Sequence, residues 1–82
     1  MNLRRRIDRL RQRKANVRFH ELRALLESAG WELKSVRGSH HSFVKAGRRP
    51  LIIVNHPGAL SPISVDRTLD ELERDIGEEG EQ

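Results

Sequence analysis

Cysteine is absent from this chain of 82 residues, and aromatic residues are few. The lack of cysteine excludes a disulfide framework, a thiolate nucleophile and any zinc site with cysteine ligands, and it is typical of proteins in a reducing, intracellular compartment. Phe19, Trp31 and Phe43 are the only aromatic residues. Because so short a chain can build only a small core, we expect these three side chains to matter greatly for its stability.

Long apolar runs are missing as well. No segment approaches the roughly 18 apolar residues that a membrane-spanning helix needs, and no apolar signal-peptide core follows the N-terminal arginines. We therefore expect a cytoplasmic protein with one folded domain and no membrane partner.

Charge is plentiful but unevenly distributed around a net value of +4. Residues 1–18 contain eight Lys or Arg and one acid, whereas residues 61–82 contain two Lys or Arg and eight acids. A dense basic segment attracts polyanions through counterion release, so nucleic acid is the first partner to consider, an anionic membrane surface the second, and a merely solvated arm the alternative. The pattern predicts a basic N-terminal extension (1–15), a domain (16–76) and an acidic tail (77–82).

Apolar residues recur at helical spacing in three segments. In residues 1–15 they form a narrow stripe among arginines, and in residues 16–29 a broader face, with Asn16 as the expected N-cap and Gly30 as the stop. Ser61 and Pro62 are typical of an N-cap followed by proline at the first helical position, and apolar residues then continue at helical spacing to Ile76. These patterns predict amphipathic helices on both sides of a central region.

The central region contains three short segments with strand character, residues 31–36, 41–45 and 51–55. Glycine-bearing connections separate them, which favours antiparallel hairpins. The expected fold is α+β in the order α-β-β-β-α, a three-stranded antiparallel sheet with two helices on one face. The other face is then open to solvent or to a ligand.

Strand alternation sends the neighbouring histidines to opposite faces. Phe43 should face the helices, so His41 shares that side and His40 points to the open face. Because the unperturbed pKa of histidine is about 6.5, an imidazole there can exchange a proton near neutrality, although an exposed turn residue without a task has the same pattern. His41 is expected to be a packing residue and His20 a surface residue, while His56 is either a second active-site group or a polar strand end. No metal site is expected, because no HxxxH or HxH pair occurs.

Several motifs along the chain, taken together, are distinctive. They are Phe19-His20-Glu21-Leu22, Ala29-Gly30-Trp31, Arg37-Gly38-Ser39-His40-His41, Gly47-Arg48-Arg49-Pro50 and Leu60-Ser61-Pro62. From about Val17 to about Ile76 the chain resembles the HicA (YcfA-like) family of mRNA interferase toxins.

The resemblance implies a fold like the double-stranded-RNA-binding domain and a metal-independent endoribonuclease that cleaves mRNA, needs no cofactor and is neutralised by a HicB-type antitoxin. The active histidine of the family matches His40, and Gly38 and Ser39 match the turn that presents it. The chain departs from the family in its extra residues 1–15 and in Asn55, where members often carry proline. The second difference puts a role for His56 in doubt.

Cations beside the histidine turn are candidates for RNA binding and for stabilising charge on the phosphate. They are Arg37, Lys45, Arg48 and Arg49. The alternative interpretation of these cations is ordinary surface charge. For the whole chain, the alternatives to an enzyme are a non-catalytic RNA-binding module or a degenerate toxin acting as an interaction protein. The acids of the last predicted helix argue against a duplex clamp, which needs cations there. Cleavage of single-stranded RNA would separate the enzyme from both alternatives.

Overall fold

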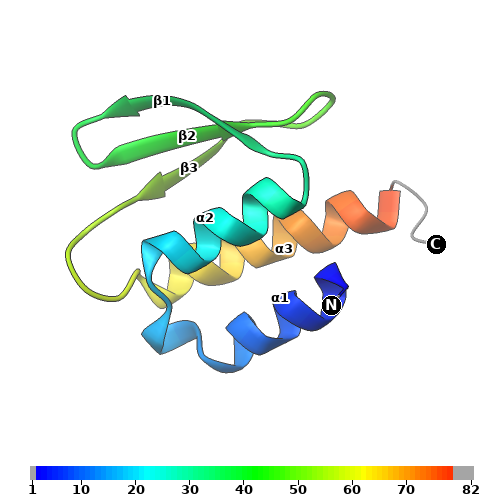
Figure 1. Ribbon diagram of the computed structural model, residues 1–82, viewed down its shortest axis with the longest axis horizontal. Helices are drawn as coiled ribbons and strands as arrows, with labels where there is room; N and C mark the ends of the chain where they lie inside the picture. Colours follow the sequence, from blue (N-terminus) through cyan, green and yellow to red (C-terminus); the bar gives the residue numbers. More distant parts are fainter. Residues whose placement is uncertain (1, 79–82) are drawn as a thin grey trace.

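The computed structural model of the protein describes residues 2–78 and has the element order α-α-β-β-β-α (Figure 1). The elements are α1 (Leu3–Gln12), the 3-10 helix η1 (Lys14–Asn16), α2 (Phe19–Ser28), β1 (Glu32–Arg37), β2 (His40–Val44), β3 (Leu51–Val54) and α3 (Pro62–Glu78). The expected acidic tail begins inside α3, and residues 79–82 lie outside the described residues.

The three strands form one antiparallel sheet in the order β1-β2-β3, which confirms the predicted topology. Each strand lies within one residue of its predicted range. Both α2 and α3 lie against the same face of the sheet, as predicted, and α1 packs beneath them on the side away from the sheet (Figure 1). The domain therefore has three layers, with the α2–α3 pair between the sheet and α1.

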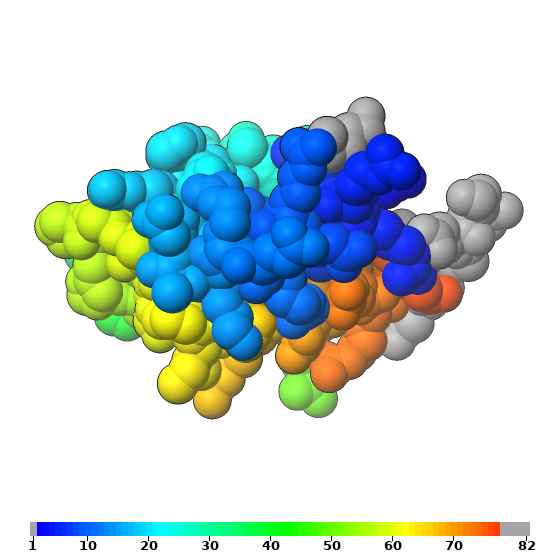
Figure 2. All heavy atoms as spheres, turned by 90° about the horizontal axis from the view of Figure 1, so that it is seen from below, coloured from blue at the N-terminus to red at the C-terminus, as the bar shows by residue number. Residues whose placement is uncertain are grey.

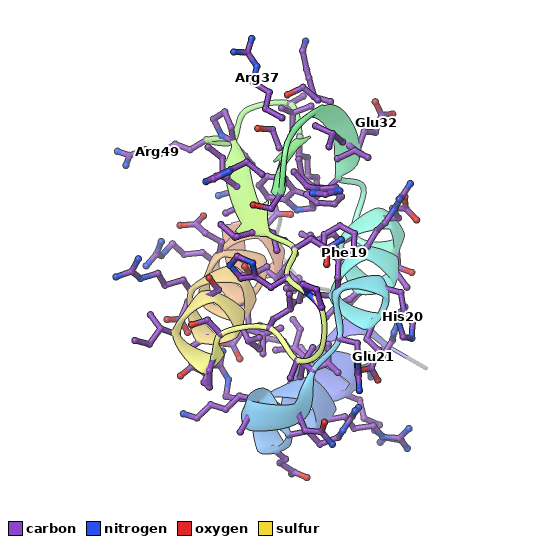
Figure 3. The ribbon with its side chains drawn as sticks, turned by 90° about the vertical axis from the view of Figure 1, so that its left-hand side faces the viewer. Phe19, His20, Glu21, Glu32, Arg37 and Arg49 are labelled. Atoms are coloured by element: carbon purple, nitrogen blue, oxygen red, sulfur yellow. The ribbon has the colours of Figure 1, made fainter. Side chains whose placement is uncertain are left out.

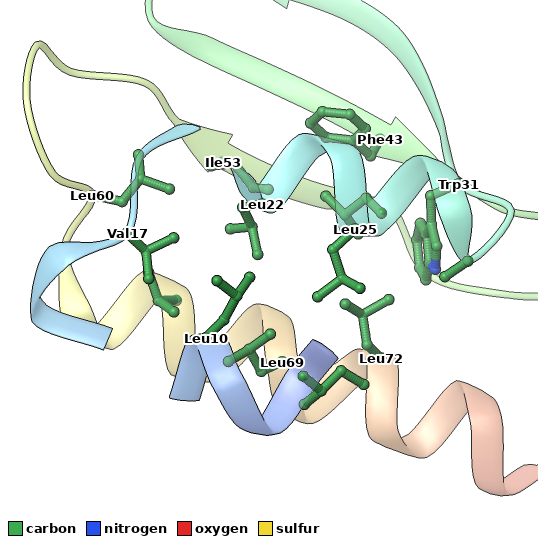
Figure 4. Packing of buried hydrophobic residues seen from close by; sticks show 14 residues of the cluster. Leu10, Val17, Leu22, Leu25, Trp31, Phe43, Ile53, Leu60, Leu69 and Leu72 are labelled. Atoms are coloured by element: carbon green, nitrogen blue, oxygen red, sulfur yellow. The ribbon is translucent and has the colours of Figure 1, made fainter. Parts of the chain in front are cut away.

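The apolar side chains of all three layers meet in one core (Figure 4). Its buried members are Ile7, Leu10, Val17, Leu22, Leu25, Leu26, Ala29, Trp31, Phe43, Ile53, Leu60, Val65, Leu69 and Leu72. The predicted helix faces and the aromatic residues Trp31 and Phe43 thus supply the core. In the part of the chain that the structure describes, no helix is both long enough and apolar enough to cross a membrane.

The N-cap predicted at Asn16 is wrong, because α2 begins only at Phe19 with Arg18 as its N-cap. Asn16 lies in η1, where its N–H donates to the carbonyl oxygen of Arg13. The buried Val17 accepts a hydrogen bond of 2.7 Å from the N–H of Leu60, and Arg18 pairs with Ala59 as an isolated antiparallel bridge. Residues 17 and 18 must be extended to make these contacts, so α2 cannot begin before Phe19.

Helix α1, which lies within the predicted N-terminal extension (1–15), packs on the domain through its narrow apolar stripe. Ile7 and Leu10 are buried against the other helices. Arg11 lies 3.2, 3.1 and 2.9 Å from carboxylate oxygens of three acids on α3, Asp66, Asp70 and Glu73. Exposed ion pairs contribute little to stability, but they fix which side of α1 faces α3.

Glu21 links the start of α2 to the end of α1. Its carboxylate accepts hydrogen bonds from the Arg13 guanidinium at 2.9 Å and from the Arg18 backbone N–H at 3.0 Å. The Arg13 hydrogen bond first, and then the Arg18 N–H, hold the pKa of Glu21 below its ordinary value. A carboxylate with a lowered pKa stabilises the fold above its unfolded pKa, and that stabilisation is lost as the pH falls through the folded pKa.

We therefore expect Glu21→Ala to lower the free energy of unfolding by about 1 kcal/mol at pH 7, the usual size of a lost N-terminal cap. Urea unfolding at pH 7 and at pH 3 measures it, and the difference from the parent should shrink at the lower pH. Glu27→Ala is the matched control, because the side chain of Glu27 makes only an exposed i,i+4 pair with Arg23, and this variant should cost a few tenths of a kcal/mol. Equal losses in the two variants would contradict the capping role.

Candidate functional site

A tight turn between β1 and β2 presents His40. Gly38, the first central residue of the turn, has a φ of +57°. The second, Ser39, has a negative φ, since no non-glycine residue of the described chain has a positive one. This combination is the pattern of a type II′ turn. The carbonyl oxygen of Ser39 accepts a hydrogen bond of 2.8 Å from the N–H of Asn55, just after β3. The backbone before His40 is therefore held from both sides.

His41 faces the helices, as the strand alternation predicted. The centroid of its ring lies 4.6 Å from that of Phe19, the first residue of α2, and its Nδ1 lies 3.2 Å from the carbonyl oxygen of Ser39. The Phe19 ring in turn lies 6.3 Å from that of the buried Phe43. His41 thus packs into the interface between sheet and α2, and the adjacent His40 is exposed on the open side.

The strand register places a cation and an apolar surface beside His40. Arg37 lies opposite His40 on β1 and Val54 lies opposite it on β3. Directly opposite residues have Cβ atoms about 4.5–5.5 Å apart, so the side chains of Arg37 and His40 can contact one bound phosphate. Ile52, 60% exposed on β3, is opposite Ser42 and adds apolar surface to the same open face. Figure 3 shows Arg37 extending away from the sheet.

The predicted RNA-binding cations are not brought together. Lys45 follows β2 at its far end, about 17 Å from His40 at the usual rise of a strand, and Arg48 and Arg49 lie in the next loop. Lys45 Nζ lies 2.7 Å from Oδ2 of Asp75 and Arg48 Nε lies 2.8 Å from Oδ1 of the same residue, which is buried on α3. Arg49 is exposed and extends outward (Figure 3). Of the residues predicted to bind RNA, therefore, Arg37, Gly38 and Ser39 adjoin His40, whereas Lys45, Arg48 and Arg49 do not.

The end of β3 adjoins the turn, a feature that sequence reasoning underrated. The hydrogen bond from Asn55 to Ser39 brings this end beside His40, and the exposed His56 is the next residue along the chain. Pairing the predicted strands residue by residue could have shown this proximity. Within residues 2–78, no three His, Asp or Glu side chains lie close enough together to hold a metal ion.

A family model described as the HicA toxin of bacterial toxin–antitoxin matches residues 19–63, more than half of the chain. The matched segment runs from the first residue of α2 through the whole sheet to the start of α3, and it includes the turn that presents His40. No curated protein and no solved structure matches the chain.

Proposed function

Because the chain belongs to the HicA family of bacterial toxin–antitoxin toxins, we propose that it is an endoribonuclease that cleaves mRNA with His40 as general base. The observation that carries this proposal is the position of His40, exposed at the start of β2 on a fixed turn and directly opposite Arg37. The imidazole and the cation are thus close enough to act on one phosphodiester.

The chemistry needs only groups that RNA and this face supply. A neutral imidazole nitrogen of His40 takes the proton of a ribose 2′-hydroxyl, and the resulting oxyanion attacks the adjacent phosphorus in line. The bond from phosphorus to the 5′-oxygen breaks, and that oxygen takes up a proton from solvent, while the His40 imidazolium returns its proton to solvent. Arg37 stabilises the negative charge that develops on the phosphate oxygens. The products are a 2′,3′-cyclic phosphate and a 5′-hydroxyl.

The proposed protein partner is a HicB-type antitoxin that covers this face, and the proposed compartment is the cytoplasm. A non-catalytic duplex-binding module is less well supported, because the side of α3 beside α1 is acidic. Its carboxylates at Asp66, Asp70 and Glu73 are already paired with Arg11. Such a surface offers little to the phosphates of a duplex.

The test is cleavage of an end-labelled single-stranded RNA by the purified protein, with and without EDTA. We expect the same rate in both, because the 2′-hydroxyl is the nucleophile and no metal-bound water is needed, and we expect cyclic-phosphate ends. An RNA with 2′-deoxyribose at the cleaved position is the control and should resist. Loss of cleavage in EDTA with recovery on adding a divalent ion, or cleavage of the deoxy substrate, would refute the mechanism.

A further inference from the structure

A groove of about 350 Å³ runs between α1 and α2, away from the open face of the sheet. Its lining residues are Arg6, Arg9, Leu10, Arg13, His20, Glu21, Ala24 and Leu25. The floor is apolar, and the rim carries three arginines and a histidine against a single acid. That acid, Glu21, is already bound to Arg13 and to the start of α2. The groove therefore presents uncompensated positive charge.

The two sides of α1 differ in their charge partners. Arg11 on one side is neutralised by carboxylates of α3, and Lys14 lies 3.0 Å from Asp66. On the groove side, Arg6 and Arg9 make no ion pair with any acid of the described chain. Figure 2, which views α1 from below, shows it lying across this face between α2 and α3. The groove side therefore keeps Arg6 and Arg9 available to an anionic ligand.

The spacing of the groove arginines suits a repeating anion. Arg6 and Arg9 are three residues apart, so they lie on one face of α1, about 4.5 Å apart along its axis. Arg13, just beyond the helix, is held by Glu21. The planar guanidinium binds phosphate oxygens through two parallel hydrogen bonds, which favours a row of phosphates over isolated carboxylates.

The groove begins at the same end of the molecule as the His40 turn. Phe19 at the start of α2 contacts His41 beneath that turn, and the next residue, His20, lines the groove. Figure 3 looks onto this end, with Arg37 on the sheet and His20 and Glu21 nearer α1. A strand that leaves His40 around the hairpin end therefore meets His20 first and the arginines of α1 next.

We propose that this groove binds the sugar–phosphate backbone of single-stranded RNA that flanks the segment held at His40. The proposal rests on the proposed function, because it names a second contact for the same RNA substrate. It also gives the basic residues at the start of the chain a specific role: Arg6 and Arg9 contact RNA, whereas Arg11 and Lys14 hold α1 in place.

The test measures RNA binding by fluorescence anisotropy as a function of salt, in the full chain carrying His40→Ala to prevent cleavage. Arg6→Gln/Arg9→Gln is compared with Arg67→Gln/Arg74→Gln, which removes the same charge from the exposed side of α3. The probes are a single-stranded RNA of about 12 nucleotides and an oligoglutamate of equal charge. In the enzyme with His40 intact, the KM for RNAs of 3 and of 12 nucleotides is also measured.

We expect the groove variant to bind RNA roughly tenfold more weakly, with the slope of log affinity against log salt shallower by about 1.4, the value for two lost single-strand phosphate contacts. The α3 variant should bind like the parent, and only the KM of the longer RNA should rise. Equal losses in both variants, no loss in the groove variant, or oligoglutamate binding that equals RNA binding and disappears with Arg6 and Arg9 would overturn the proposal. Groove-dependent RNA binding without any cleavage would instead refute the enzyme proposal alone.

Discussion

Replacing His40 by alanine is expected to slow RNA cleavage by about 10²–10⁴-fold, the usual contribution of a positioned general base. The melting temperature should hardly change, because His40 is exposed at the edge of a turn and the described structure gives its ring no hydrogen bond. We expect His40→Ala to bind RNA as the parent does, so that kcat falls while KM is unchanged. This result would place the loss in the chemical step.

His41→Ala is the matched control, one residue away with the opposite expectation. It removes the ring that packs 4.6 Å from Phe19 and the contact of Nδ1 with Ser39. We expect a loss of about 1–2 kcal/mol in the free energy of unfolding, or roughly 4–8 °C in melting temperature for each kcal/mol, while cleavage by the folded protein stays within a few-fold of the parent. Near-normal cleavage by His40→Ala would refute the proposed role of this residue.

The features that could be predicted from the sequence depend on local periodicity. Alternation with a period of two assigned His40 and His41 to opposite faces, and helical spacing predicted the apolar faces of α2 and α3 that supply the core, all before any tertiary contact was known. The strand order followed from short connections that allow only hairpins. Such signals need no information about distant residues, which is why they were reliable here.

The features that could not be predicted depend on contacts between distant residues. Asn16 has the chemistry of an N-cap, but the pairing of residues 17 and 18 with 59 and 60 delays α2 to Phe19. The narrow apolar stripe of α1 was assigned to an extension outside the domain, yet Ile7 and Leu10 pack on the outer side of the α2–α3 layer. A local pattern does not reveal which surface a third layer will cover.

The same limit applies to Lys45 and Arg48. In the sequence they stand close to the histidine motif and match the expected chemistry of RNA-binding cations. Their partner Asp75 lies 30 residues from Lys45 along the chain, among acids that the sequence gives no reason to distinguish. Burial distinguishes it, since Asp75 is 1% exposed whereas the side chain of Asp70 is 55% exposed.

Replacing Asp75 by leucine is expected to lower the free energy of unfolding by about 3–5 kcal/mol, the usual cost of removing one member of a buried ion pair. The side chains of Lys45 and Arg48 are only 17% and 13% exposed, so water cannot replace the lost carboxylate fully. Lys45 also donates a hydrogen bond of 2.8 Å to the carbonyl oxygen of Ala29 at the end of α2, so β2, α2 and α3 are joined at this point. Asp70→Leu, at the exposed pair with Arg11, should cost at most about 1 kcal/mol.

A triple variant keeps the experiment decisive if Asp75→Leu does not fold. Lys45→Met, Arg48→Met and Asp75→Leu together replace the ion cluster by apolar side chains of similar size, and we expect most of the lost stability to return. Urea unfolding of the single and triple variants measures both effects, and a triple variant no more stable than the single one would contradict the explanation. Because Lys45 lies about 17 Å from His40, the triple variant should also cleave RNA as the parent does. If the triple variant melts like the parent but has lost cleavage, Lys45 and Arg48 have two roles. They then pair with Asp75 and also bind RNA, as their position in the sequence near the histidine motif first suggested.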